Sequence, residues 1–598
     1  MVIGLILAVM SCVPGTVGGA TLDTHTVVLD GESKIIPWTA NPADGYDRVM
    51  FLSWDLLKNR IPNDPANGLP VTYTHSEYKP GNLSGSTWPN NPAGKNAMLA
   101  DSALLYYAYS GDYAVIDLVR GLLNHQLQYG TTPTNYAWAR VPWSTAAAGS
   151  VTYGNDSMQE GAGVLEPDKV GELGYHGYLR FYQLTGDTNY LNAAIACADA
   201  LALRVRVGNA TQSPWPFRVM AQSGTVIEQY CAHAIAPIRL FDELIRLGLG
   251  NTNSYQTARQ SAWTWLMTYP MSNRVWAGYF EDVTGGIDNV NQYAPGQTAR
   301  YLLERPELDA AWFNRVTNML AFIETNFGGT DMGEPGLQYG ARVISEQDEY
   351  KYKMASHTSR FGAVNAMLYE LTGDTSVKEK AYRSLNWSTY MCRNNGVVIE
   401  GPFEFAKNDN CWFTDGHGDY VRHFMLALGA IPEWSPAGQN HITRSTSLIK
   451  SVSYASNNIA YTTFDGSSTE TLRLGFVPGS VTVNGAGLSP RADLAQPGWV
   501  FDPNTGVMRI RHDTGTSVQI RDDVPPPVIT SIVLAEGIVI LTWTSVAGKT
   551  YRVEYGETGV GSGWTNSLPE VTATGPKTSV TNAVATSGRF YRVVCPAE

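Results

Sequence analysis

A helical hairpin with a tight Gly-Asp turn recurs along most of the chain, and this repeat limits the possible folds more than any other feature. In Met354–Asp374 the apolar residues fall on one helix face, at Val364, Met367, Leu368 and Leu371. Gly373 can adopt the left-handed conformation that ends a helix, and Asp374 can cap the next one. The same ending closes Leu104–Asp112 and Tyr178–Asp187. The chain therefore repeats a unit of two antiparallel helices.

Repeated helical hairpins of this size predict an α/α toroid, in which inner helices line a barrel and outer helices surround it. An open helical solenoid is the alternative. The long inserts between hairpins are rich in Trp, Tyr and Asn, and long loops in compact domains are usually functional, which favours the toroid. Expected inner helices lie near 92–109, 166–185, 230–247, 293–304, 355–372 and 416–429. Expected outer helices lie near 113–129, 188–206, 253–270, 309–326 and 376–393.

The helix expected at Tyr46–Lys58 would pair with the last inner helix and close the ring. This arrangement has six hairpins, and a seventh is possible if an insert contains one, so the predicted catalytic region is an (α/α)6–7 toroid within residues 21–440. Ahead of it, Val2–Val13 are almost wholly apolar, and Gly18-Gly19-Ala20 suits signal-peptidase cleavage. We therefore expect residues 1–20 to be a signal peptide. The mature protein would be secreted, periplasmic or attached to the cell surface.

After Trp434 the apolar residues alternate with period two. Ser480–Gly485, Trp499–Pro503 and Val507–His512 read as strands of a small β-sandwich, assigned to residues 441–522. Val524–Pro527 is a stiff, Pro-rich linker. Strand patterns at 538–556 and 588–594 resemble a fibronectin type III domain, assigned to residues 523–598.

The composition restricts the partners. A net charge of −12 without a basic stripe argues against nucleic acid, and no apolar run is long enough to indicate a membrane span. Charged residues make up 16% of the chain and aromatic residues 11%, a balance that suits both a sugar-binding protein and a large aromatic core. The five cysteines after Cys12 are widely spaced, so Cys392 and Cys411 could form a disulfide or remain buried thiols. A monomer without a cofactor or metal is expected.

In an α/α toroid the cleft forms where the inner helices begin, and polar clusters occur at these positions. They lie in 87–96, 166–178, 228–237, 288–301, 345–360 and 412–423. The substrate-binding candidates are Trp88, Asn90, Asn91, Lys95, Tyr175, His176, Trp215, Asn291 and His357. Trp88, Trp138 and Trp215 lie in loops with Pro or Asn, so we expect them to be sugar platforms, with core packing as the alternative.

Tyr293, His233 and Arg300 are the catalytic candidates. Tyr293 precedes Ala294-Pro295 at a helix start, where it could donate a proton to a leaving group or serve as an aromatic wedge. His233 begins the neighbouring inner helix and could face Tyr293, or could be a core histidine bonded to backbone. Arg300 lies two turns further on and could lower the pKa of Tyr293 or bind a carboxylate. Its alternative is an ion pair with Glu304.

This set of side chains suits β-elimination from a uronate polymer. The C5 proton beside the carboxylate becomes acidic enough to remove only when Asn, His or Arg neutralises the carboxylate. A base then takes that proton, and Tyr or His protonates the departing O4. The reaction needs no metal.

With the segments WPNNPAGKN, YCAHAIAP and NQYAPGQTARY, the helical region resembles the toroidal uronate lyases, and polysaccharide lyase family 38 in particular, whose members cleave glucuronan and alginate. The resemblance covers roughly Tyr46–Trp434. It implies a lyase acting on a glucuronan-like or alginate-like polymer, in which His233 and Tyr293 carry out the elimination and Asn and Arg groups hold the carboxylate. Together with the expected signal peptide, this predicts a secreted polysaccharide lyase.

Two other functions remain open. An inverting glycoside hydrolase on the same fold needs two carboxylates on either side of the scissile bond. The candidates are Asp168 or Glu172, Asp282 or Asp288, Glu346 or Asp348, and Asp415. A non-catalytic carbohydrate-binding surface protein would need only the aromatic loops.

Overall fold

The computed structural model describes residues 19–86, 91–145, 147–157, 161–280, 283, 286–403, 410–522, 526–535, 537–556, 564–567, 569–583 and 589–595. Most of the expected signal peptide lies outside them. Within these residues, none of the helices combines the length and apolar character needed to span a membrane.

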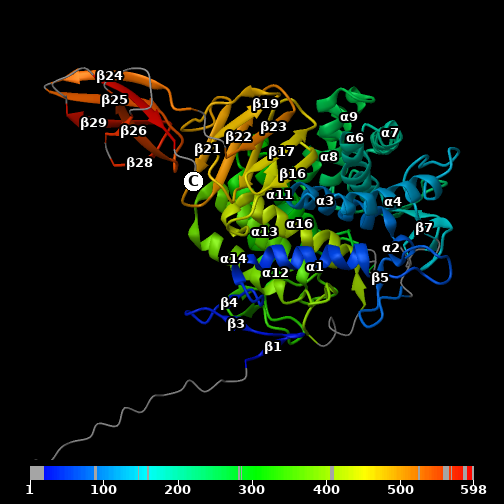
Figure 1. Cartoon of the computed structure of the whole chain (residues 1–598). Helices are drawn as coiled ribbons and strands as arrows, with labels where there is room; N and C mark the ends of the chain where they lie inside the picture. Colours follow the sequence, from blue (N-terminus) through cyan, green and yellow to red (C-terminus); the bar gives the residue numbers. More distant parts are fainter. Residues whose placement is uncertain are drawn as a thin grey trace, which may run out of the picture.

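Two sets of helices build the larger part of the molecule (Figure 1). The inner set is α3 (Pro92–Ser110), α5 to α6 (Pro167–Glu172, Arg180–Thr185), α8 (Ile235–Leu247), α11 (Tyr293–Glu304), α13 (Ala355–Thr372) and α16 (Tyr420–Ala430). The outer set is α4 (Ala114–Tyr129), α7 (Thr188–Arg204), α9 (Thr252–Thr268), α12 (Trp312–Phe327), α14 (Thr375–Thr389) and α1 (Gly45–Asn59). Two short helices, α2 (Val71–Thr74) and α10 (Pro270–Asn273), lie in connections.

The inner helices form a closed ring. Each packs on the next in chain order, and α16 packs back on α3. Each outer helix packs on an inner one, and α1 contacts α16 as the sequence predicts. The fold is therefore an α/α toroid, and the described residues form six hairpins.

The predicted Gly-Asp turns are confirmed. Gly111, Gly186 and Gly373 end inner helices with φ of 74°, 76° and 72°, the left-handed conformation that favours glycine. Asp187 and Asp374 then cap the outer helices α7 and α14, since Asp374 Oδ1 accepts from the Ser376 backbone N–H at 2.9 Å. The outer helix α4 instead begins after Tyr113, without a side-chain cap. In the α13 stripe, Val364, Met367 and Leu368 are buried. Leu371 is instead 43% exposed in the last turn.

Three inner helices differ from the expectation. Residues 230–234, at the expected start of the third inner helix, are not helical, because the Ala232 N–H bonds the Ala277 carbonyl at 2.8 Å instead of continuing the helix. The second and sixth inner helices contain π-helical turns at η2 (Leu173–Leu179) and η4 (Thr414–Asp419). Such turns often occur at functional sites.

Short strands lie ahead of α1 and in the connections between the helices. They are β1 (Thr21–Leu22), β2 (His25–Thr26), β3 (Val28–Leu29), β4 (Ile35–Ile36), β5 (Glu77–Tyr78), β6 (Ser144–Thr145), β7 (Tyr153–Ser157), β8 (Gly161–Ala162), β9 (Val164–Leu165), β10 (Arg218–Met220), β11 (Val226–Glu228), β12 (Leu337–Gln338), β13 (Ala341–Arg342) and β14 (Cys411–Trp412). Cys392 and Cys411 are both buried free thiols, so the disulfide alternative is not realised.

Two antiparallel sheets follow the helices. One has the order β15-β18-β22-β21 and the other β16-β17-β23-β19-β20. Their bounds are β15 (His441–Ser445), β16 (Ile449–Ala455), β17 (Asn458–Thr463), β18 (Ser468–Arg473), β19 (Ser480–Val483), β20 (Ala486–Gly487), β21 (Gly498–Asp502), β22 (Val507–His512) and β23 (Ser517–Arg521). The sheets attach to the toroid where His441 stacks on Tyr109 at 3.9 Å between ring centroids.

A buried ion pair in these sheets makes their stability depend on pH. Glu470 accepts from the Tyr461 hydroxyl at 3.0 Å, and His512 Nε2 lies 3.4 Å from the same carboxylate. Burial opposes a charge on His512, but Glu470 prevails and raises the pKa of His512 above its ordinary value.

We expect the stabilisation from His512 to be complete below its unfolded-state pKa of about 6.5 and to be lost as the pH rises through the higher folded-state pKa. Hydrogen exchange in β18 and β22 should therefore accelerate with rising pH beyond the intrinsic increase, and His512→Gln should remove this extra dependence. The control is His125→Gln, because this substitution also removes a histidine but lies in the toroid and not in the two sheets. An extra dependence that persists in His512→Gln would contradict the assignment.

The last module has a three-stranded sheet, β24-β25-β29, and a second sheet centred on β26, which pairs β27, β28 and β30. Its strands are β24 (Ile529–Ala535), β25 (Ile538–Thr544), β26 (Thr550–Gly556), β27 (Thr565–Asn566), β28 (Val571–Thr572), β29 (Lys577–Ala583) and β30 (Phe590–Val594). Trp543 and Tyr551 lie in its small core. Figure 1 shows this module projecting from the rest of the molecule.

Candidate active site

The mouth of the barrel, where the inner helices begin, places Tyr293 at the centre of a buried polar cluster. The Asn291 side chain accepts from the Ala294 N–H at 3.0 Å and so fixes the start of α11. The Tyr293 hydroxyl donates to Glu172 Oε1 at 2.6 Å and accepts from Arg422 Nη2 at 3.1 Å. Burial and the Glu172 carboxylate raise the pKa of Tyr293. Its hydroxyl therefore holds its proton in the resting protein.

His233 lies beside this tyrosine, as predicted. Its ring meets the Tyr293 ring edge-on, with 5.1 Å between centroids. Nδ1 lies 3.2 Å from Asp168 Oδ2, which orients the imidazole. Although burial disfavours the carboxylate charge, Lys169 and His233 lower the pKa of Asp168. Asp168 and His233 therefore form a carboxylate–imidazole pair, which leaves Nε2 as the ring nitrogen for other chemistry.

Tyr279 is a third aromatic ring of the cluster, which the sequence analysis missed. It stacks on Tyr293 at 3.7 Å between centroids, and Lys169 Nζ lies 3.2 Å from its ring centre. Gly278 makes this approach possible, because its φ is +70° and a Cβ there would lie 2.0 Å from the Tyr230 carbonyl oxygen. The backbone before Tyr279 thus contacts the segment that carries His233.

Gly278→Ala is expected to destabilise the protein and displace Tyr279. The left-handed conformation costs a non-glycine residue about 1–2 kcal/mol, and the clash adds about 1–3 kcal/mol. Denaturant midpoints measure the loss. Gly186→Ala is the matched control, since Gly186 has φ +76° with no atom within 4 Å of its Cβ position. Equal losses of stability in the two variants would show that a Cβ at position 278 does not clash with the Tyr230 carbonyl oxygen.

Two buried guanidinium groups complete the cluster. The Arg360 guanidinium lies 4.3 Å from the Tyr293 ring centre and pairs with Asp419. Arg422 donates from Nε to Asp419 Oδ1 at 2.7 Å. Burial lowers the pKa of Arg360 to about 10, so the group still carries its charge at neutral pH. The candidate site is thus strongly polarised although it lies inside the barrel.

A second charged layer lies deeper in the barrel, around Asp101. Arg300 Nη1 donates to Asp101 Oδ2 at 3.1 Å, and His176 Nδ1 lies 3.3 Å from Oδ1. Burial disfavours the carboxylate, but His176, Arg300 and Arg422 together hold the pKa of Asp101 well below its usual range. Arg300 also pairs with Glu304 through Nε at 2.7 Å. The alternative reading of Arg300 is correct, and Arg422 is the arginine that bonds the Tyr293 hydroxyl.

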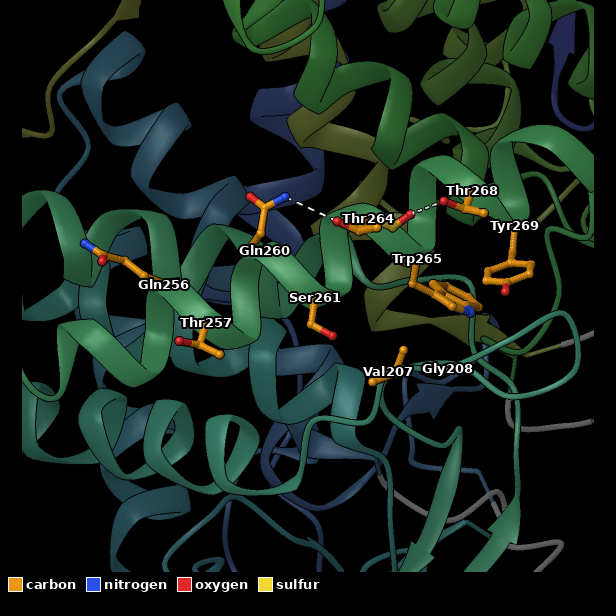
Figure 2. A pocket seen from close by; sticks show the side chains of 10 residues that line it. All are labelled: Val207, Gly208, Gln256, Thr257, Gln260, Ser261, Thr264, Trp265, Thr268 and Tyr269. Carbon is orange, nitrogen blue, oxygen red and sulfur yellow. Dashed lines mark hydrogen bonds between the residues drawn. The ribbon is translucent and has the colours of Figure 1, made fainter.

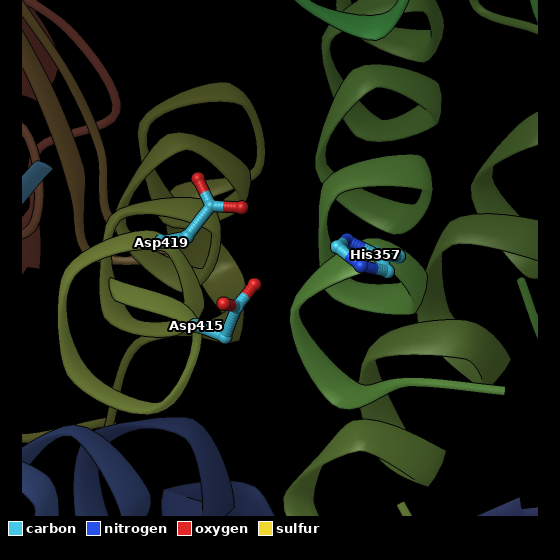
Figure 3. Close-up of side chains that lie close together, drawn as sticks. All are labelled: His357, Asp415 and Asp419. Atoms are coloured by element: carbon cyan, nitrogen blue, oxygen red, sulfur yellow. The ribbon is translucent and has the colours of Figure 1, made fainter. Parts of the chain in front are cut away.

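His357, Asp415 and Asp419 approach one another next to this cluster, since Asp419 pairs with Arg360 and Arg422 (Figure 3). Their potential ligand atoms all lie within 4.8 Å of one another, and this is the one such group in the part of the chain that the structure describes. Burial lowers the pKa of His357 to about 3, so the ring is neutral. Arg360 and Arg422 already pair with Asp419, so a metal ion here would compete with two guanidinium groups.

Three of the predicted substrate-binding residues have structural roles instead. Asn91 caps the start of α3 and donates from Nδ2 to Glu166 Oε2 at 3.0 Å. Lys95 is 1% exposed and donates to the His75 carbonyl at 2.9 Å, and burial lowers its pKa well below the usual value. Asn291 accepts from the Ala294 N–H and fixes the start of α11, as described above. Tyr175 is partly exposed and meets His176 edge-on at 4.7 Å.

The expectation that tryptophans form sugar platforms is wrong for Trp215 and Trp138. Trp215 is 3% exposed, donates from Nε1 to the Leu201 carbonyl at 2.9 Å and packs on Phe241. Trp138 is 2% exposed. The Trp215 indole thus fills the core between α7 and α8, and Trp138 lies in the same hydrophobic core with the Arg204 guanidinium over its ring. Trp88 and Asn90 lie outside the described residues.

Arg422 was missed because it lies on the apolar α16 and pairs mainly with residues far away in the sequence. One signal was available, since Asp419 and Arg422 are three residues apart, a spacing at which helical side chains meet. Tyr279 had no comparable signal.

No family model and no curated protein matches the chain. Among solved structures, cellobiose 2-epimerase from Spirochaeta thermophila DSM 6192 is 13% identical over 66% of this chain and 99% of that chain, with a TM-score of 0.45. A family 76 glycoside hydrolase from a bovine Bacteroides thetaiotaomicron strain is 13% identical over 65% and 78%, with a TM-score of 0.45. An unsaturated glucuronyl hydrolase specific for heparin is 10% identical over 64% and 96%, with a TM-score of 0.41. These likenesses concern the path of the chain, and no site residue is carried over from them.

Proposed function

We propose that the protein is a secreted lyase that cleaves a uronate polymer by β-elimination at the barrel mouth. The observation that carries this proposal is the position of the Tyr293 hydroxyl. It lies between the Glu172 carboxylate and the Arg422 guanidinium, and its ring meets that of His233. A tyrosine that keeps its proton and a histidine oriented by a carboxylate supply an acid and a base at one place.

In the proposed reaction His233 Nε2 takes the C5 proton of the uronate. The electron pair of the C5–H bond forms the C4–C5 double bond, and the C4–O4 bond breaks. Tyr293 gives its proton to the departing O4, and Arg422 stabilises the resulting phenolate. The products are a chain with a new hydroxyl end and a chain with an unsaturated uronate end. Proton transfer from His233 to Tyr293 through solvent restores the resting state.

The surrounding cations support the elimination. Lys169 and Arg360 lie against the faces of Tyr279 and Tyr293, where their positive charge favours the enolate-like charge that develops on the substrate carboxylate. Within a buried site such charges act with little screening by water. A neutral sugar has no carboxylate on C5 for these cations to stabilise. Their presence therefore favours a uronate as the substrate.

Access requires a change of shape at the mouth. Tyr293 is 1% exposed and His233 is 3% exposed, so a polymer cannot reach either side chain in the conformation described. The proposal therefore includes an opening of the rim when substrate binds, as in other enzymes whose closed sites exclude water.

The decisive experiment mixes the purified protein with glucuronan, alginate and polygalacturonate. A lyase produces the ultraviolet absorbance of the unsaturated end together with new reducing ends. Reducing ends without that absorbance would replace the proposal with hydrolysis. Binding without either product would assign the protein to the non-catalytic carbohydrate-binding class.

Hydrolysis is the second candidate, and the carboxylates opposite His357 favour it. Asp415 is partly exposed, and its carboxylate lies near that of Asp419. Ser356 Oγ donates to Asp415 Oδ1 at 2.8 Å and holds it in place. If the protein is a hydrolase, Asp415→Asn abolishes activity while Tyr293→Phe does not. The lyase mechanism predicts the opposite result, in which Tyr293→Phe loses far more activity than Asp415→Asn.

A further inference from the structure

A groove lies on the outer wall of the toroid, between α9 and the segment that follows α7 (Figure 2). Its volume is about 690 Å³. The residues that line it are Val207, Gly208, Gln256, Thr257, Gln260, Ser261, Thr264, Trp265, Thr268 and Tyr269. Figure 2 shows Ser261 and Trp265 of α9 pointing toward Val207 and Gly208. This surface is separate from the buried cluster around Tyr293.

None of the lining side chains is charged. The exposed face of a surface helix normally carries Lys, Arg, Asp or Glu, which keep the surface hydrated and soluble. Along α9 that face instead carries Gln and Thr over about three turns. Arg206 borders the groove, but its guanidinium bonds the carbonyls of Ser213 and Gln229 at 2.8 and 3.0 Å and does not line it.

The groove keeps hydrogen-bonding capacity for a ligand. Thr268 Oγ1 donates to the Thr264 carbonyl at 2.7 Å, and Thr257 Oγ1 donates to the Asn253 carbonyl at 3.1 Å. Each hydroxyl thereby uses its proton and keeps its lone pairs as acceptors. Gln260 supplies amide donors and a carbonyl acceptor. Such a surface matches a ligand rich in neutral hydroxyl groups.

The wall opposite α9 is held in place before any ligand binds. Gly208 has φ +75°, and a Cβ there would lie 2.5 Å from the Trp265 indole. Trp265 Nε1 donates to the Asn209 carbonyl at 2.9 Å, so the indole anchors this loop. Val207 stays 83% exposed above it, an apolar surface for the face of a sugar ring. A preformed groove binds without the cost of ordering a loop.

The groove ends beside the barrel mouth. As an outer helix, α9 runs antiparallel to α8, so its last turn lies near the start of α8. Trp265 meets the Tyr230 ring at 5.4 Å between centroids, and Tyr230 is three residues before His233. One end of the groove therefore lies near the segment that carries His233, although none of its lining residues belongs to the cluster around Tyr293.

We propose that this groove binds a neutral oligosaccharide segment, independently of the reaction at the barrel mouth. Anionic polymers are disfavoured because the lining offers no cation and the whole chain carries a net charge of −12.

The test is affinity electrophoresis of the full chain in gels containing a soluble β-glucan, a mannan or a xylan, with alginate as the anionic comparison. The variant Gln256→Ala/Gln260→Ala/Thr264→Ala removes exposed side chains on α9 and keeps its helix propensity. We expect at least one neutral polysaccharide to retard the wild type. The dissociation constant of the variant for it should be raised about tenfold or more.

The matched control is Asn314→Ala/Thr317→Ala/Asn318→Ala on α12, another outer helix, and it should bind like the wild type. Retardation by none of the three neutral polysaccharides overturns the proposal, as does equal binding by the α9 variant. A concentration-dependent dimer of the wild type, lost in the α9 variant and seen by sedimentation, would also overturn it and make the groove an interface between copies.

Discussion

Replacing Tyr293 by Phe is expected to lower turnover of a uronate polymer by about 10²–10⁴-fold, the usual effect of losing a general acid. The substitution keeps the ring that stacks on Tyr279 and deletes only the hydroxyl between Glu172 and Arg422. Steady-state rates of unsaturated-product formation measure the effect. His233→Ala should be similarly severe. The double variant should lose much less than the product of the two single losses, because the two residues act as a unit.

Tyr255→Phe is the matched control for this prediction. Tyr255 is a buried tyrosine whose hydroxyl also donates to a carboxylate, Asp199, at 2.6 Å, but it lies on the outer helix α9. Its loss should affect stability and leave turnover within a few-fold of the wild type. Near-normal turnover in Tyr293→Phe would remove Tyr293 from the mechanism, and Tyr175 and His357 would become the next residues to test.

Arg422→Met is expected to lower the free energy of unfolding by about 3–5 kcal/mol, the range seen when one partner of a buried ion pair is removed. Arg422 is 1% exposed and pairs with both Asp419 and Asp101. Methionine fills part of the space but leaves both carboxylates with one cation fewer. Because the same guanidinium bonds Tyr293, turnover should fall as well. Chemical denaturation followed by circular dichroism measures the stability change.

Arg444→Met is the control, since Arg444 is 43% exposed and pairs with Glu370 on the surface. Exposed ion pairs contribute about 0–1 kcal/mol, so this variant should unfold close to the wild type. A loss of unfolding free energy below about 1 kcal/mol in Arg422→Met would be no larger than that of an exposed ion pair. It would mean that Arg300 and Arg360 compensate for the missing charge, and that the charged side chains at the barrel centre interact less strongly than their distances indicate.

The sequence by itself determined the helical hairpins and the change to strands. Helix periodicity, the left-handed glycine and the capping aspartate all act within about ten residues of chain, so a pattern such as Leu104–Asp112 specifies its own local structure. The position of Tyr293 at a helix start was predictable for the same reason, and two neighbouring inner helices bring it beside His233. The expected helix at 230–234 failed because its backbone bonds Ala277, which a local pattern does not reveal.

The tertiary structure alone decided which charges meet inside the barrel. Tyr293 bonds Glu172 and Arg422 across 121 and 129 positions of sequence, and His233 pairs with Asp168 across 65. The same closure of the ring buried Lys95 and Trp215, which the loop composition had suggested would face substrate. A side chain's burial and partners depend on which helices adjoin it in the closed ring. That arrangement is set by packing over the whole chain, so it cannot be predicted from any short segment of the sequence.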